Sequence, residues 1–333
     1  MNVSVLTKIG CICCFSALLL SACSDYQFHK IEGSALGTYY AITYKGKEKP
    51  ELQAGIDSIL NVINENFSIF NPNSIISKVN NNQEASLNED FVEVFEMAQR
   101  IGQETNGALE MTIGPLVNLW GFGKDERVSD LSQATIDSVL TFVGYRKIRI
   151  ENGQIVKDNP NIQLNFNALA KGYAVDKVAD FLVSKGYEDC VVDIGGEIVA
   201  KGKKYHDQQW NIGVQTPTKT RDGEMRSAQT FHLQDQATAT SGNYRNYFEE
   251  DGQRYTHIID PVTGRPEKSN LLSVTVIADR CIIADAYATA FMVMGVEKTK
   301  KLLDKHPELT CIFITDEHGN YQLEVYPDAK TKD

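Results

Sequence analysis

Asp285 and Thr289 are the residues whose types and spacing most directly suggest chemistry. They lie four positions apart in the stretch from Cys281 to Gly295, which is otherwise almost wholly apolar. Residues four apart on a helix share one face, so a carboxylate and a hydroxyl would lie side by side. Such oxygen ligands suit Mg²⁺, with phosphate oxygens and water completing the octahedron. In the structural alternative, Asp285 caps the helix and the Thr289 hydroxyl bonds back to a backbone carbonyl.

Lys171 and His257 are candidates for holding an anion and accepting a proton. Lys171 stands where a strand end at Asn165 is expected to pass into a helix, whose first N–H groups attract anions. His257 precedes the turn signal Asp-Pro-Val-Thr-Gly, and an imidazole is a natural proton acceptor near neutral pH. Taken singly, a plain strand-to-helix connection and a structural histidine explain the two residues as well.

Other familiar site motifs are missing or incomplete. The chain has no GxGxxG and no complete Walker loop, which argues against Rossmann and P-loop folds. It has no HExxH, and no CxxC beyond residue 22, so a zinc site has no support. The pair Gly195 and Gly196 follows an apolar strand, where it permits either a tight turn or close approach of a ligand to the backbone.

Composition indicates a globular, acidic protein. The 333 residues are 42% hydrophobic and 23% charged, enough for one large domain or two smaller ones. The net charge of -11 has the wrong sign for a protein that neutralises nucleic-acid phosphates, so we expect no nucleic-acid partner. A phosphorylated cofactor remains compatible with this charge if a metal ion meets the phosphates.

The N-terminus carries a targeting signal. Lys8 precedes an apolar run that ends in Leu-Ser-Ala-Cys, and the run is too short to span a bilayer. This pattern resembles a bacterial lipoprotein signal, with residues 1–22 removed and Cys23 lipidated; the alternative is an ordinary secretory signal. We expect a tether over 23–30, a catalytic domain over 31–330, and an exported chain anchored by lipid, on the periplasmic side of the inner membrane.

Hydrophobic periodicity and turn residues predict a mixed fold. Helices are expected at 52–67, 91–101 (with Asn88 as N-cap), 132–142, 165–185 after a strand end, 284–294 and 297–305. Strands are expected at 39–44, 190–194, 210–214, 230–233, 272–278, 310–315 and 321–326. Strict βαβ alternation is absent, so the pattern favours an α+β fold of largely antiparallel sheets with packed helices. Cys190, Cys281 and Cys311 lie in apolar runs and are expected to be buried, with at most one disulfide.

Taken together, several segments between residues 33 and 294 resemble the ApbE family of FAD:protein FMN transferases. In chain order they are 35–40 (ALGTYY), 70–77 (FNPNSIIS), 114–123 (GPLVNLWGFG), 167–174 (NALAKGYA), 193–197 (DIGGE), 240–245 (TSGNYR), 257–264 (HIIDPVTG) and 284–290 (ADAYATA). The combination is far more specific than any one segment. It is also consistent with an exported lipoprotein.

The resemblance implies Mg²⁺-dependent cleavage of FAD, with FMN passed to a Thr or Ser hydroxyl of a target protein and AMP released. It implies that Mg²⁺ is held by Asp285, Thr289 and the backbone carbonyl of Ala168, and that His257 is the base. The implied FAD contacts are Leu36, Phe70, Trp120, Gly121, Phe122, Asn165, Lys171 and the backbone near Ile259. The implied target proteins carry a flavinylation Ser/Thr motif and are subunits of membrane redox complexes.

Two residues depart from the family pattern, and two other functions remain open. Leu36 replaces a usual Met, a swap that conserves volume, whereas Asn165 replaces a common Asp and removes a charge. The same site could hydrolyse FAD to FMN and AMP. A lipoprotein that only binds FAD is the third reading, although binding alone would not require both a metal site and a base.

Overall fold

An antiparallel sheet forms the centre of the fold. The structure is a computed structural model that describes residues 27–124, 127–219, 225–243, 247–250, 253–267, 269–317 and 320–327. The 8-stranded sheet has the spatial order β1 (Gln27–Ala35), β2 (Thr38–Gly46), β5 (Cys190–Ile194), β6 (Glu197–Lys201), β9 (Gln236–Gly242), β14 (Leu271–Ala278), β15 (Thr310–Glu317) and β16 (Asn320–Tyr326). Every neighbouring pair is antiparallel, which confirms the predicted α+β class.

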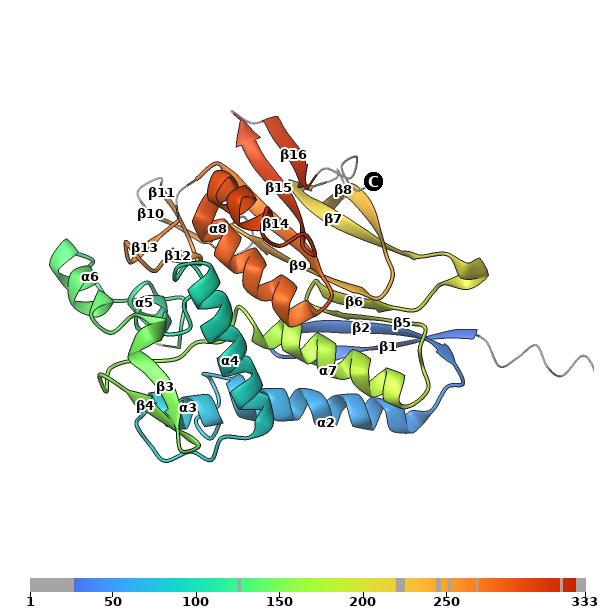
Figure 1. The fold of residues 1–333 in the computed structure, drawn as a ribbon, viewed down its shortest axis with the longest axis horizontal. Helices are drawn as coiled ribbons and strands as arrows, with labels where there is room; N and C mark the ends of the chain where they lie inside the picture. The colour runs from blue at the N-terminus through green and yellow to red at the C-terminus, as the bar shows by residue number, and fades with distance from the viewer. Residues whose placement is uncertain are drawn as a thin grey trace, which may run out of the picture.

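Two helices cover one face of this sheet. Helix α7 (Ala170–Ser184) packs on β5 and β6, and α8 (Cys281–Leu303) packs on β9 and β14 (Figure 1). Helix α2 (Pro50–Phe67) packs against α7 through the predicted apolar stripe. The opposite face carries the hairpin of β7 (Trp210–Lys219) and β8 (Met225–Leu233), whose Trp210 and Leu233 are buried.

The remaining helices and strands lie outside the central sheet. They are α3 (Ile75–Asn80), α4 (Glu89–Glu104), α5 (Gly114–Leu119), α6 (Gln133–Leu140), η1 (Tyr145–Lys147), β3 (Ile148–Glu151), β4 (Gln154–Lys157), η2 (Tyr205–Asp207), β10 (Tyr247–Glu250), β11 (Gln253–Thr256), β12 (Ile259–Asp260) and β13 (Arg265–Pro266). The predicted N-cap of α4 is confirmed, because the Asn88 side chain accepts the Phe91 N–H at 2.9 Å.

Two local predictions need adjustment. Strand β1 begins at Gln27, so the sheet takes up part of the expected tether. No named strand ends at Asn165 before α7; the nearest pairing is an isolated bridge between Ile113 and Gln163. The predicted break between two C-terminal helices is confirmed, because α8 is interrupted at Gly295, whose φ of 72° is not helical. The predicted signal peptide and Cys23 lie outside the described residues.

The turns at one end of the central strands create the space for a site. The β1–β2 turn has Leu36 at φ 53° and Gly37 at φ 75°, and the β5–β6 turn has Gly195 at φ 66° and Gly196 at φ 102°. Strand register places both turns at the same end of the sheet, next to the end of β9. A leucine in the left-handed region costs about 1 to 2 kcal/mol. That cost falls on a residue that lines the cleft described below.

The described cysteines are buried, as predicted. Cys190, Cys281 and Cys311 are free thiols, and each of the three residues is 0% exposed. They pack as small apolar side chains in the main core and form no disulfide with one another.

Candidate active site

A cleft of about 810 Å³ opens at the turn-bearing end of the sheet. This volume is within the range of small-molecule sites. Most of the predicted site residues line it, namely Leu36, Phe70, Phe122, Asn165, Ala168, Lys171, His257, Ile259, Asp285 and Thr289. Residues more than 200 positions apart in the chain are thus brought together by the sheet, α7 and α8. Trp120 and Gly121 are the predicted site residues that do not line the cleft.

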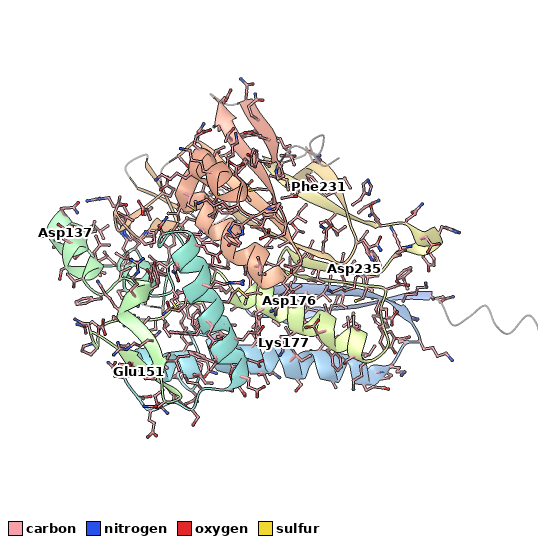
Figure 2. All side chains as sticks on the ribbon, viewed as in Figure 1. Asp137, Glu151, Asp176, Lys177, Phe231 and Asp235 are labelled. Carbon is pink, nitrogen blue, oxygen red and sulfur yellow. The ribbon has the colours of Figure 1, made fainter. Side chains whose placement is uncertain are left out.

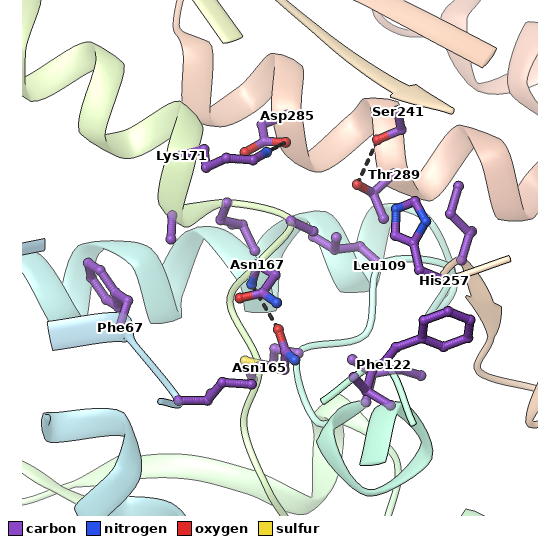
Figure 3. Close-up of a pocket in the computed structure, with 18 of the residues that line it drawn as sticks. Phe67, Leu109, Phe122, Asn165, Asn167, Lys171, Ser241, His257, Asp285 and Thr289 are labelled. Carbon is purple, nitrogen blue, oxygen red and sulfur yellow. Dashed lines mark hydrogen bonds and ion pairs between the residues drawn. The ribbon is translucent and has the colours of Figure 1, made fainter. Parts of the chain in front are cut away.

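Asp285 and Thr289 both face the cleft from α8, as their spacing predicts (Figure 3). Asp285 is 3% exposed, and its Oδ2 accepts the Gly172 N–H at 3.0 Å. The Thr289 Oγ1 lies 3.0 Å from the Ser241 Oγ at the end of β9. The Thr289 hydroxyl is therefore hydrogen-bonded to a side chain of β9. It does not make the bond to a carbonyl of its own helix that was the alternative explanation for this residue.

The first turn of α8 is capped by a carboxylate from α7. Asp176 accepts the N–H of Cys281 at 2.8 Å and that of Ile282 at 3.0 Å, where the two helices meet (Figure 2). Burial raises the pKa of Asp176 to about 6, although these two hydrogen bonds act in the opposite direction. Asp285 is therefore free of the capping role and holds its carboxylate one turn farther along.

Lys171 lies between two carboxylates. Its Nζ is 2.9 Å from Glu197 Oε1 and 3.8 Å from Asp285 Oδ1. Burial alone would lower the pKa of Lys171, but the negative charges of Asp285 and Glu197 outweigh it and raise that pKa. Burial also raises the pKa of Glu197, and the positive charge of Lys171 opposes this shift. The raised pKa of Lys171 keeps its ammonium charged in the cleft wall.

Gly172 sets the distance between α7 and α8. A Cβ at this position would lie 2.4 Å from the Cys281 carbonyl oxygen and 2.8 Å from the Ile282 Cα. Gly172→Ala should therefore push the helices apart and lower the free energy of unfolding by about 2 to 3 kcal/mol. Chemical denaturation would measure this loss. Gly153→Asn is the comparison without crowding: nothing lies within 4 Å of a Cβ there, but the φ of +74° is left-handed, so this variant should lose only about 1 kcal/mol.

The opposite wall is built from amide and aromatic side chains. The backbone N–H of Asn165 donates to the Met111 carbonyl at 2.8 Å. The Asn165 side-chain oxygen accepts the backbone N–H of Asn167 at 2.9 Å (Figure 3). The Phe122 ring lies edge-on to His257, with ring centroids 6.4 Å apart. Phe70 is 68% exposed at the rim. Flat aromatic surfaces of this kind suit the rings of a nucleotide or a flavin.

Comparison with known proteins identifies the family. The model of the ApbE family matches residues 36–313. The chain belongs to the ApbE family. It is 38% identical over 294 residues to the FAD:protein FMN transferase of Vibrio cholerae, covering 85% of this chain and 86% of the relative. It is 32% identical over 312 residues to the Escherichia coli K12 protein of the same name, covering 90% and 88%.

Solved structures of ApbE proteins have the same fold. The flavin transferase ApbE from Vibrio cholerae superposes with a TM-score of 0.82 at 32% identity, covering 92% of this chain and 99% of the other. The apo flavinyl transferase ApbE from Pseudomonas stutzeri gives a TM-score of 0.79 at 29% identity, covering 91% and 96%. The α+β fold predicted from the order of helices and strands is therefore the fold of the ApbE family.

Trp120 supports the cleft of this ApbE chain from behind. It is 2% exposed, and its Nε1 donates to the Gly264 carbonyl at 2.8 Å, so it holds the turn that follows Ile259. Gly121 has φ 75°, and a Cβ there would lie 2.7 Å from the Arg127 Cβ. Both residues shape the loops that carry the wall, and the direct contact with FAD that the family resemblance implies for them stays a prediction.

Replacing Trp120 by Phe tests this supporting role. The loss of the bond to Gly264 should lower the free energy of unfolding by about 1 kcal/mol and raise the KM for FAD severalfold. Trp210→Phe is the matched control, because Trp210 Nε1 donates to the Lys201 carbonyl at 2.8 Å and Trp210 does not line the cleft. The control should lose similar stability with an unchanged KM, and equal KM values for both variants would contradict the assignment.

Two ApbE site residues were not singled out from the sequence. Glu197 pairs with Lys171, and Ser241 bonds to Thr289. Both lie in segments that carry the family resemblance: Glu197 is the first residue of β6, and Ser241 is the last but one of β9. Their place in those segments was the available signal, but only the fold shows which partners these side chains meet.

Proposed function

We propose that this chain transfers FMN from FAD to a Ser or Thr hydroxyl of a target protein and releases AMP. The observation that carries the proposal is the convergence of Asp285, Thr289, Lys171 and His257 on one cleft of a chain in the ApbE family. The names of the relatives, FAD:protein FMN transferase, support the same activity.

The donor set in the cleft fits Mg²⁺ held jointly with a substrate. Among the described residues, no group of three or more His, Cys, Asp or Glu side chains could hold a metal. The candidate set has instead one carboxylate, one hydroxyl and one backbone carbonyl, from Asp285, Thr289 and Ala168, all lining the cleft. Mg²⁺ commonly uses so few protein ligands when substrate phosphates and water complete its shell. Bound there, it would neutralise charge on the pyrophosphate.

The protein's own groups account for the other requirements of the reaction. The acceptor hydroxyl must lose its proton, and we assign that proton to His257, which lines the cleft. The hydroxyl oxygen forms a bond to the phosphorus of the FMN half, and the bond from that phosphorus to the bridging oxygen breaks. AMP leaves with that oxygen and with the negative charge. The Lys171 ammonium stabilises phosphate charge in the cleft wall throughout.

We also infer an exported, lipid-anchored protein that acts beside a membrane. The lipoprotein-like segment ending at Cys23 supports this inference. Within the described part of the chain, no helix has the length and apolar character needed to cross a membrane. Flavin-carrying subunits of membrane redox complexes are then natural acceptors, because enzyme and acceptor would share one surface.

Product analysis separates this function from its two alternatives. The chain lacking residues 1–22 is incubated with FAD and Mg²⁺, or with EDTA, with and without an acceptor domain bearing a flavinylation-type Ser/Thr motif. The transferase predicts AMP release that needs both Mg²⁺ and acceptor. Free FMN together with AMP in the absence of acceptor would favour a hydrolase, and intact FAD bound to the protein would favour a carrier.

A further inference from the structure

Glu197 has no role in the proposed chemistry, yet it lies at the centre of the charged part of the cleft. It is the first residue of β6, directly after the Gly195–Gly196 turn, and it is 4% exposed. Its Oε1 is 2.9 Å from the Lys171 Nζ. Its Oε2 is fully buried and has no hydrogen-bond partner among the described residues.

Stability does not explain this carboxylate. A buried ion pair repays the loss of hydration only when its remaining hydrogen-bonding positions are satisfied, and here one oxygen is left without a partner. An apolar side chain of similar size would serve the core of β6 at least as well. The Glu197–Lys171 pair therefore calls for an explanation in the function of the cleft.

The geometry shows what the pair does to Asp285. The Asp285 Oδ2 is occupied by the Gly172 N–H at 3.0 Å, which leaves Oδ1 as the oxygen on the side of Lys171. The Lys171 ammonium stands 3.8 Å from that Oδ1 but only 2.9 Å from Glu197. Without Glu197, the ammonium would have Asp285 as its nearest carboxylate, and a close ion pair there would compete with a metal for the same oxygen.

We propose that Glu197 is a positioning residue that holds the Lys171 ammonium away from Asp285 Oδ1. Asp285 then remains open to a divalent cation, while Lys171 stays in the wall to meet a phosphate. This role rests on the proposed function, because it assigns Asp285 to a metal. Glu197 acts through Lys171 and touches neither substrate nor metal. Outer partners of this kind commonly change metal affinity by about 10-fold to 100-fold when replaced.

A double-mutant cycle with metal affinity as the readout tests the role. The variants are Glu197→Gln, Lys171→Met and the two combined. Mn²⁺ binding is measured by EPR with the metal alone, and the Mg²⁺ concentration for half-maximal FAD cleavage is measured alongside. Glu197→Gln should lower the Mn²⁺ affinity about 10-fold and raise the half-maximal Mg²⁺ concentration about 10-fold. Adding Lys171→Met should restore the Mn²⁺ affinity to within about threefold of the wild type or better.

Two results would overturn the positioning role. Unchanged metal affinity in Glu197→Gln is one. The other is a double variant as weak as Glu197→Gln, because Glu197 would then act through its own charge rather than through Lys171. Asp189→Asn is the matched control: it removes a carboxylate paired with Lys45 at 2.9 Å, at the other end of β5, and should leave metal affinity unchanged.

The same cycle distinguishes failure of this role from failure of the proposed function. A wild-type chain that binds no Mn²⁺ and cleaves FAD equally well in EDTA would contradict the metal site, and with it the role of Glu197. A metal-dependent wild type with an unaffected Glu197→Gln variant would contradict only the role of Glu197. Thermal unfolding of each variant shows whether the fold is retained.

Discussion

Replacing Asp285 by Asn should reduce metal-dependent flavin transfer by about 1000-fold or more. The amide oxygen can still accept the Gly172 N–H, so the packing of α7 on α8 is kept while the charged oxygen is lost. A metal ion bound to a reacting phosphate stabilises the transition state by several kcal/mol, and each 1.4 kcal/mol of stabilisation is about a tenfold change in rate. The rate of FMN transfer to the acceptor, followed by mass at several Mg²⁺ concentrations, measures the effect.

Asp279→Asn is the control for this prediction. Asp279 lies just before α8, is exposed, and does not line the cleft. It should leave the rate and its Mg²⁺ dependence unchanged. Near-normal transfer by Asp285→Asn would show that Asp285 is not a metal ligand. A joint role of Asp285 and Thr289 in binding Mg²⁺ would then be contradicted as well.

Replacing His257 by Ala should separate binding from chemistry. FAD affinity should stay within about threefold, because the cleft is lined by many other residues, whereas transfer should fall about 100-fold to 10,000-fold with the loss of the general base. FAD affinity is measured from the change in flavin fluorescence on binding, and transfer from single-turnover labelling of the acceptor. Raising the pH should partly recover transfer, since hydroxide can replace the lost base.

His232→Ala provides the comparison for His257. His232 lies on β8, is exposed, and its Nδ1 is 2.7 Å from the Asn211 Oδ1, far from the cleft lining. Its replacement should change neither affinity nor rate. If His257→Ala transferred FMN at the normal rate, the base would have to be another group, and the assignment made here would be wrong.

Local patterns predicted the helices and strands well where a periodic apolar face meets a recognisable end. The stripe of α2 and the N-cap Asn88 of α4 are examples, because both depend on residues a few positions apart. Asp285 and Thr289 belong to the same class, since helix geometry alone places them on one face. The strand end expected at Asn165 failed because its backbone is held by single bonds to distant segments rather than by a ladder.

Contacts between distant segments could not be read from the chain. Asp176 caps α8 from α7, more than 100 positions away, and Glu197 meets Lys171 only because the β5–β6 turn lies beside α7. Trp120 donates its indole N–H to the carbonyl of Gly264, which is 144 positions away. In each case the residue type was visible in the sequence, and the partner was supplied by the packing of segments that are far apart in the chain.

The most direct test of the proposed function is the intact mass of an acceptor domain after incubation with the chain, FAD and Mg²⁺. The proposal predicts a gain equal to one FMN less one water, because the acceptor hydroxyl replaces AMP at the phosphorus. The gain should disappear with EDTA and in an acceptor whose Ser or Thr is replaced by Ala. An acceptor of unchanged mass, with FAD converted to free FMN and AMP, would contradict flavin transfer as the activity of this site.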